Sequence, residues 1–168
     1  HCVETREVTS HVEPRSFWGV HLLFPAVGAA VTSMAGATET QPRFEVGFEY
    51  LRGRGRFAWG VRASALIDGG DERSVVSAPI VGVAHLSLGE RFSVYGGAGA
   101  SPFTRAAGDA PVDSYLGLRA LAGIQTVLKR TRGSTYVLLG LEADTFWARF
   151  DAGNYLSTGL TAHLGLFL

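Results

Sequence analysis

The sequence has a single cysteine, Cys2, among its 168 residues. One cysteine excludes a disulfide framework within the chain and a zinc site built from several cysteines. An excess of one charge sign is also missing, because 15 basic residues balance 15 acidic ones and the pI is near 7.2. The sequence has no Lys/Arg-rich run with interleaved aromatic residues. It therefore gives no sign of a nucleic-acid partner.

Long hydrophobic runs are absent as well. No uninterrupted apolar stretch reaches the length of about 18 residues that a membrane-spanning helix needs. The sequence opens with the polar segment 1–15 and shows no signal peptide, as expected for an exported protein after cleavage. Even so, 46% of the residues are hydrophobic, 22 are glycine, and the mean hydropathy is +0.17. Soluble domains are usually more charged and poorer in glycine, so the apolar residues must be organised in another way.

Apolar residues recur at every second position along nearly the whole chain. Phe44 and Phe48, for example, alternate with Glu45 and Glu49. This period is the signature of a β-strand with two different faces. It is clearest in 43–51, 56–67, 115–128 and 155–168, and weaker in 17–31, 74–88, 91–101 and 134–147. Eight such segments predict eight strands.

The strand lengths and connections favour a membrane barrel. Several alternating runs are longer than the strands of soluble proteins, which average about 5–6 residues, and match a strand tilted across a bilayer. Tight, basic connections at 52–55, 88–91 and 129–133 alternate with segments that are longer on average and more acidic. The expected longer segments are 32–42, 68–73, 102–113 and 149–154. Short turns at one end and longer loops at the other are typical of outer-membrane barrels.

These observations predict an all-β, eight-stranded antiparallel transmembrane β-barrel over 17–168, preceded by an N-terminal tail at 1–16. The pattern resembles the small outer-membrane barrels of the OmpA/OmpX type over the same range. The end of the chain, 164–168, is similar to the terminal strand that the insertion machinery reads in that family. The resemblance implies a bacterial outer-membrane location with a periplasmic tail, periplasmic turns and both termini in the periplasm.

The two faces of the strands differ in a way that favours a membrane over water. Bulky apolar residues form one face, and glycine, serine, threonine and isolated charges form the other, which suits the narrow interior of an eight-stranded barrel. A turn centred between residues 53 and 54 places Glu45 opposite Arg62. A turn centred between residues 130 and 131 places Arg119 opposite Glu142, with Asp144 diagonal. Buried charges require such partners, so these five residues are the predicted interior charge network. Solvated charges on a wet sheet face are the alternative.

Aromatic residues gather near the strand ends, which resembles the two aromatic girdles of membrane barrels. The expected turn-end group is Trp18, Tyr50, Phe57, Phe92, Tyr136 and Phe167, and the expected loop-end group is Phe44, Phe103, Tyr115, Phe146, Trp147 and Tyr155. Pro25 and Pro79 fall inside expected strands, where each removes a backbone donor. A bulge or an early strand end is therefore expected at both prolines.

Candidate catalytic and metal-binding groups are few. His21, His85 and His163 all take the inward phase near the turn end, where they could bind a metal or serve as polar packing. His85 and Ser87, with Glu90 nearby, are similar to the His-x-Ser pair of lipid A deacylase barrels. The pair lies at the turn end, however, which is the wrong side for that substrate. We therefore predict no catalytic residues, no metal site and no cofactor.

Two further features suggest contacts with other molecules. In the small-residue segment 96–100, Ala98 and Ala100 form a smooth apolar surface that is suited to contact with another membrane protein. The alternative is that the small residues of this segment relieve crowding inside the narrow barrel. Cys2 is a candidate for lipidation or for a disulfide to another chain. The sequence as a whole predicts a non-enzymatic outer-membrane barrel, a membrane anchor or a structural or interaction subunit of an envelope assembly. Its expected partners are outer-membrane lipid and other envelope proteins. A narrow pore for small solutes, a lipid-modifying enzyme and a soluble ligand-binding barrel are the alternatives.

Overall fold

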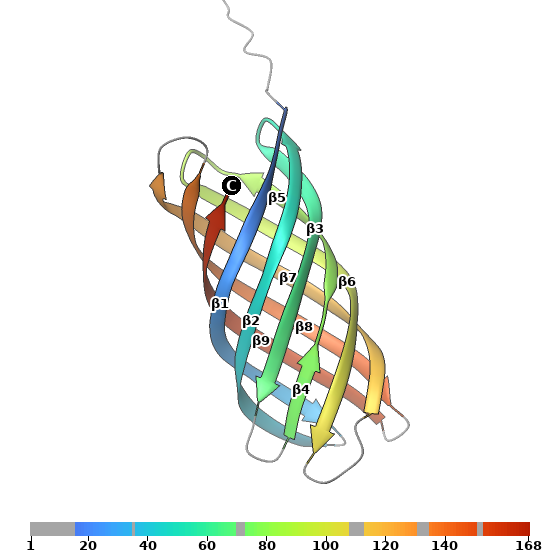
Figure 1. Cartoon of the computed structure of the whole chain (residues 1–168). Helices are drawn as coiled ribbons and strands as arrows, with labels where there is room; N and C mark the ends of the chain where they lie inside the picture. Colours follow the sequence, from blue (N-terminus) through green and yellow to red (C-terminus); the bar gives the residue numbers. More distant parts are fainter. Residues whose placement is uncertain (1–15, 35, 70–72, 108–112, 131–134, 151–152) are drawn as a thin grey trace, which may run out of the picture.

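The computed structural model describes residues 16–34, 36–69, 73–107, 113–130, 135–150 and 153–168. These residues form one closed β-barrel whose strands wind around a common axis (Figure 1). Within the described ranges, no helix is long and apolar enough to cross a membrane.

Nine strand segments make up the wall in the described part of the chain. They are β1 (Ser16–Met34), β2 (Ala37–Arg54), β3 (Phe57–Gly69), β4 (Arg73–Ser77), β5 (Ile80–Ser87), β6 (Phe92–Ala107), β7 (Asp113–Arg130), β8 (Tyr136–Phe150) and β9 (Gly153–Phe167). All neighbours pair antiparallel, and β1 closes the ring by pairing with both β2 and β9. Because β4 and β5 both lie between β3 and β6, they share one position and the ring has eight. The predicted eight-stranded antiparallel barrel is confirmed.

Successive side chains point alternately into and out of the barrel. Along β2, Phe44, Phe48 and Tyr50 are exposed on the outer wall, whereas Glu45 and Glu49 are buried inside. The pleat of a β-strand produces this alternation, because neighbouring Cβ atoms lie on opposite faces. The period-two pattern of the sequence therefore assigned inside and outside correctly on this strand.

The outer wall of the barrel is mainly apolar. Large apolar side chains are exposed there on every long strand, including Val46, Val61, Ile80, Leu116, Leu118, Leu141, Leu160 and Leu164. A surface of this kind is unfavourable in water and is typical of the lipid-facing band of a membrane barrel. The girdle prediction holds for exposed aromatics such as Trp18 and Trp147 but is wrong for Phe103, Phe146 and Tyr155, which are buried inside.

The β2–β3 turn lies two residues later than the sequence predicts. Gly55 has a φ of 65°, a conformation that a two-residue hairpin turn requires and that glycine adopts without strain. Arg54 therefore faces Phe57 across the hairpin. The shift leaves every side chain on its expected face but moves each cross-strand partner by four positions. The expected partner of Glu45 is consequently wrong.

The loop-end connections are shorter than the sequence predicts. β1 continues to Met34 and β2 begins at Ala37, so strands cover most of the expected 32–42 connection. Thr32 and other polar residues there point inward, and backbone pairing does not require apolar side chains. The expected connection at 149–154 shortens in the same way, because β8 and β9 cover most of it.

Both expected strand irregularities at proline are present. The register of β1 shifts between Leu23 and Ala26, on either side of Pro25. β4 ends at Ser77 and β5 begins at Ile80, which leaves Pro79 in the break. The break stays closed because the backbone N–H of Ser64 donates to the carbonyl oxygen of Pro79 at 3.2 Å.

Candidate functional site

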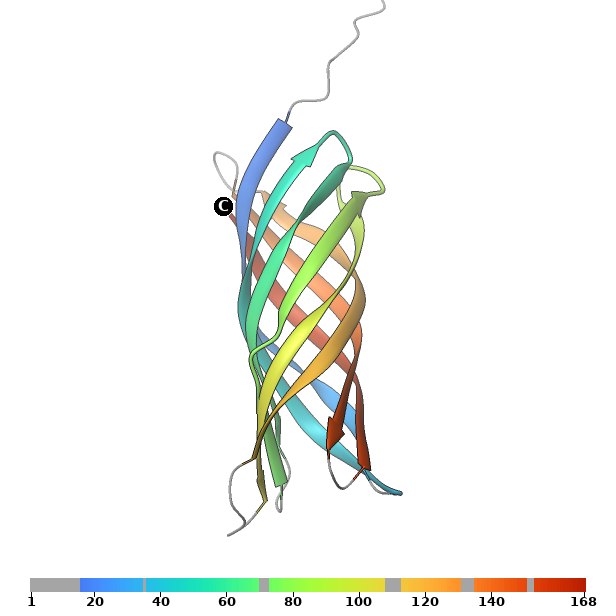
Figure 2. The same ribbon diagram turned by 90° about the vertical axis from the view of Figure 1, so that its right-hand side faces the viewer.

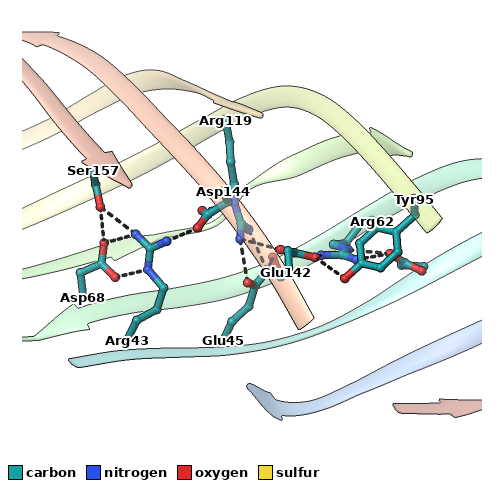
Figure 3. Close-up of polar contacts among 11 residues, drawn as sticks. Arg43, Glu45, Arg62, Asp68, Tyr95, Arg119, Glu142, Asp144 and Ser157 are labelled. Carbon is teal, nitrogen blue, oxygen red and sulfur yellow. Dashed lines mark hydrogen bonds and ion pairs between the residues drawn. The ribbon is translucent and has the colours of Figure 1, made fainter. Parts of the chain in front are cut away.

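The interior of the barrel is filled at mid-height by charged side chains from strands on opposite sides of the wall (Figure 3). At their centre is Arg119 on β7. Its Nη1 and Nη2 atoms donate to the two carboxylate oxygens of Glu45, each at 2.7 Å. Its Nε atom donates to Asp144 at 2.9 Å, and Nη2 lies 3.3 Å from Glu142. Such two-pronged, charge-assisted hydrogen bonds fix both the position and the orientation of the guanidinium.

A second guanidinium, that of Arg62 on β3, lies on the turn side of this centre. Its Nε atom donates to Glu49 at 2.6 Å, and its Nη1 atom pairs with Glu142. The hydroxyl of Tyr95 donates to the same Glu142 at 2.9 Å, and Arg62 lies 5.3 Å from the centre of the Tyr95 ring. Glu142 is thus shared by Arg62 and Arg119, which joins the two clusters.

The third guanidinium, that of Arg43 on β2, lies on the loop side. Its Nε and Nη2 atoms donate to the two oxygens of Asp68 at 2.6 and 2.7 Å. Its Nη1 atom pairs with Asp144, and Nη2 also donates to the hydroxyl of Ser157 at 2.7 Å. Since Asp144 also binds Arg119, one unbroken chain of ion pairs runs along the barrel axis.

At the turn side the chain of ion pairs ends in histidines. Glu49 lies 3.0 Å from Nδ1 of His21 and 3.3 Å from Nε2 of His85. His85 stacks on Tyr95 at 5.0 Å between ring centres, and His163 lies 6.3 Å from both His21 and Tyr95. Among the described residues, no group of His, Cys, Asp and Glu side chains is arranged to hold a metal ion.

Aromatic side chains fill the interior at the loop end. Phe103 packs edge-to-face on Phe146 at 5.0 Å between ring centres and stacks on Tyr115 at 5.6 Å. Tyr155 and Val75 complete this cluster. The interior therefore contains two successive clusters of side chains, an aromatic one at the loop end and an ionic one at mid-height.

The structure brings together all five residues of the predicted network, but through contacts different from those the sequence predicts. All five are buried inside the barrel. Across the hairpin, Arg62 faces Glu49, and Glu45 faces Leu66. Glu45 instead pairs with Arg119 from the opposite wall. The predicted placement of Glu142 directly opposite Arg119 is wrong, because Phe146 is the cross-strand neighbour of Arg119 and Glu142 faces Gly123. The long Arg119 side chain still binds Asp144 and lies 3.3 Å from Glu142.

Sequence reasoning missed Arg43, Asp68 and the role of Glu49. Arg43 and Asp68 face each other directly across β2 and β3. Arg43 follows the same odd-numbered phase as Glu45 and Glu49, so the alternation did contain the signal. Asp68 was not predicted to face the interior, because the sequence pattern places it in the connection 68–73 rather than at the end of a strand.

The remaining predicted positions lie on the wall or outside the described residues. Ala98 and Ala100 are exposed on the outer surface of β6, and Ala98 lies between Gly82 and Ala120 of the neighbouring strands. Their role as a partner contact stays a prediction. Cys2 lies outside the described residues, as does most of the predicted tail 1–16.

Comparison with known proteins shows the class of fold. No protein-family model and no curated protein matches the sequence. Among solved structures, Neisserial surface protein A is similar, with a TM-score of 0.65 and 12% identity over 90% of this chain and 97% of that one. Ail of Yersinia pestis, in complex with the heparin analogue sucrose octasulfate, has a TM-score of 0.53 and 16% identity over 88% and 98%. The chain therefore has the fold of the small, eight-stranded outer-membrane β-barrels.

Proposed function

We propose that this protein is a non-enzymatic, non-conducting barrel of the bacterial outer membrane. It acts as a membrane anchor or as a structural or interaction subunit of an envelope assembly. The observation that carries the proposal is the filled interior, in which Arg43, Arg62 and Arg119 and their carboxylate partners occupy the centre.

The filled interior argues against the narrow-pore alternative. A permeating solute would have to separate buried ion pairs, and removing one partner of such a pair costs about 3–5 kcal/mol. It would then have to pass the aromatic cluster around Phe103 and Phe146. The outer wall and the two ends of the barrel are therefore the surfaces on which this protein would act.

The apolar outer wall supports residence in a membrane, and the position of the chain ends supports its orientation. Ser16 at the start of β1 lies opposite Arg54, and β9 ends nearby at Phe167 (Figure 2). Both ends of the barrel chain thus lie on the side of the β2–β3 turn. In the proposed orientation this side faces the periplasm, and outer-membrane lipid surrounds the apolar wall.

The enzyme alternative has weaker support in the geometry. The His85 ring is stacked on Tyr95 and faces Glu49, while Ser87 lies further along β5 at the turn end. A serine hydrolase would instead need the imidazole to bind the serine hydroxyl and be oriented by the acid.

Single-channel recording in planar bilayers tests the proposal. The wild-type protein should give no conductance steps under conditions in which a porin, used as a positive control, inserts and conducts. Reproducible steps whose size changes on substitution of Arg62 or Arg119 would contradict the proposal and favour the pore. Crosslinking in native membranes then separates the two versions: recovery of envelope proteins supports an interaction subunit, and recovery of lipid alone supports an anchor.

A further inference from the structure

The turn end of the barrel has a concentration of exposed positive charge. Exposed basic side chains come from the end of β2, the β2–β3 turn, the β5–β6 turn and the end of β7: Arg52, Arg54, Arg56, Arg91 and Lys129. We call these five residues the basic rim. Among the described residues of this end, Glu90 is the one exposed acidic side chain. The turn end is therefore strongly basic, although the charges of the whole chain balance.

Backbone hydrogen bonds place the turns of the basic rim next to one another. The N–H of Ser87, at the end of β5, donates to the carbonyl oxygen of Arg56 at 2.8 Å. The N–H of Val127 on β7 donates to the carbonyl oxygen of Arg91, also at 2.8 Å, and Lys129 follows two residues later. Neighbouring turns thus present cations along one arc of the barrel, from β2 to β7.

The position of Arg52 relates this arc to the membrane. Arg52 has the outward phase of β2, and its cross-strand neighbours are Trp18 on β1 and Trp59 on β3. These tryptophans are 73% and 57% exposed on the outer wall. Tryptophan is enriched where the hydrocarbon of a bilayer meets its headgroups, because one end of the ring is apolar and the other carries an N–H donor. Arg52 therefore lies at the depth of the lipid headgroups.

Four charges of the basic rim are not neutralised within the described part of the protein. The ion pairs among the described residues do not include Arg52, Arg56, Arg91 or Lys129. A guanidinium binds phosphate through paired N–H donors, and a cation beside an anionic membrane surface gains about 1 kcal/mol. A soluble acidic partner could reach the turns, but it would not account for a cation between two lipid-facing tryptophans.

We propose that the basic rim binds the headgroups of anionic phospholipids, whose acyl chains lie on the apolar wall beside Trp18 and Trp59. The phosphates contact Arg52 and Arg56, and this contact holds the turn end at a fixed depth in the bilayer. Binding requires only insertion into a bilayer, whereas its place in the periplasmic leaflet rests on the proposed function.

Quenching of tryptophan fluorescence by brominated lipids tests the proposal. The chain has three tryptophans, of which Trp18 and Trp59 lie at the turn end and Trp147 at the loop end. The full chain is reconstituted in vesicles of phosphatidylcholine and phosphatidylglycerol, with bromine on the acyl chains of one lipid or the other. Trp147→Phe leaves the turn-end reporters, and the double variant Trp18→Phe/Trp59→Phe leaves the loop-end reporter. Both leaflets have the same composition, so the direction of insertion does not affect the result.

The turn-end reporters should show an about 5-fold preference for phosphatidylglycerol over phosphatidylcholine, equivalent to about 1 kcal/mol. High salt should reduce this preference, because it screens exposed charges. Trp147 should report a smaller preference. An equal preference at the two ends would overturn the proposal while leaving the proposed function intact. Quenching by neither lipid would overturn the membrane location itself, and the proposal with it.

Matched charge variants identify the residues that bind. Arg52→Gln combined with Arg56→Gln should lower the turn-end preference to within about 2-fold of phosphatidylcholine, whereas Arg149→Gln at the exposed loop end should leave it unchanged. An unchanged preference in the double variant would overturn the proposal. Labelled polyglutamate tests the soluble alternative. If it binds the wild-type barrel in phosphatidylcholine vesicles while the two lipids quench equally, the basic rim serves an acidic soluble partner and the proposal is overturned.

Discussion

The carboxylate of Glu45 on β2 binds the guanidinium of Arg119 on β7 through two hydrogen bonds of 2.7 Å across the barrel interior. The two residues are 74 positions apart and lie on strands that are not neighbours in the ring. The pair therefore ties opposite walls of the barrel together. Because Arg119 also binds Asp144 and contacts Glu142, its removal leaves Glu45 without its ion-pair partner and takes one of the partners of Asp144 and of Glu142.

Arg119→Met should destabilise the barrel by about 3–5 kcal/mol, the usual cost of breaking a buried ion pair. Urea-induced unfolding in lipid vesicles, followed by tryptophan fluorescence, measures the change. The matched control is Arg52→Met, because Arg52 is exposed at the turn end and should contribute within about 0.5 kcal/mol. Equal, small effects of both substitutions would contradict the proposed importance of the interior pair.

The register of the β2–β3 hairpin predicts which carboxylate is coupled to Arg62. A double-mutant cycle of Glu49→Gln with Arg62→Met should give a coupling energy in the range of about 0.5–3 kcal/mol found for contacting residues. The parallel cycle with Glu45→Gln should give a smaller value, since Arg119 is the direct partner of Glu45. A larger coupling for Glu45 would instead favour the register expected from the sequence.

A close approach between strands predicts a large effect of one glycine substitution. A Cβ atom at Gly99 would collide with the backbone of Ile80 and Val81 on β5, so Gly99→Ala should cost about 1–3 kcal/mol through overpacking. Gly82→Ala on the neighbouring strand is the control, because its Cβ would meet no atom closer than the Ala98 carbonyl oxygen at 3.8 Å. The same unfolding experiment measures both, and equal stability of the two variants would show that this close approach is absent.

The sequence predicted the wall of the barrel well because its signal is local. Within each strand, the alternation of apolar and polar residues indicates which side chains face outward, as exposed Phe44 and buried Glu45 illustrate. The register of the β2–β3 hairpin could not be predicted in the same way, because the segment 52–56 contains two glycines and either of them could form the turn. The backbone conformation of Gly55 decides between them.

The sequence predicted which residues belong to the interior charge network better than it predicted which of those residues contact one another. Alternation tells whether a residue faces the interior, but it does not give the height at which residues on distant strands meet. Arg119 and Glu45 meet because strand tilt and stagger bring them to one level. The inward position of Phe146 was accessible from the alternation, because Phe146 has the same phase as Glu142 and Asp144; it was assigned to a lipid-facing girdle from its place near the strand end alone, as was Phe103.

The central claim is that this chain forms a closed barrel embedded in a membrane. Its most direct test is gel migration in SDS of protein extracted with detergent from the membrane fraction, with and without boiling. A compact band that migrates faster in the unboiled sample and shifts on boiling is the predicted result. Release of the protein into buffer without detergent, together with identical migration of the boiled and unboiled samples, would contradict the claim.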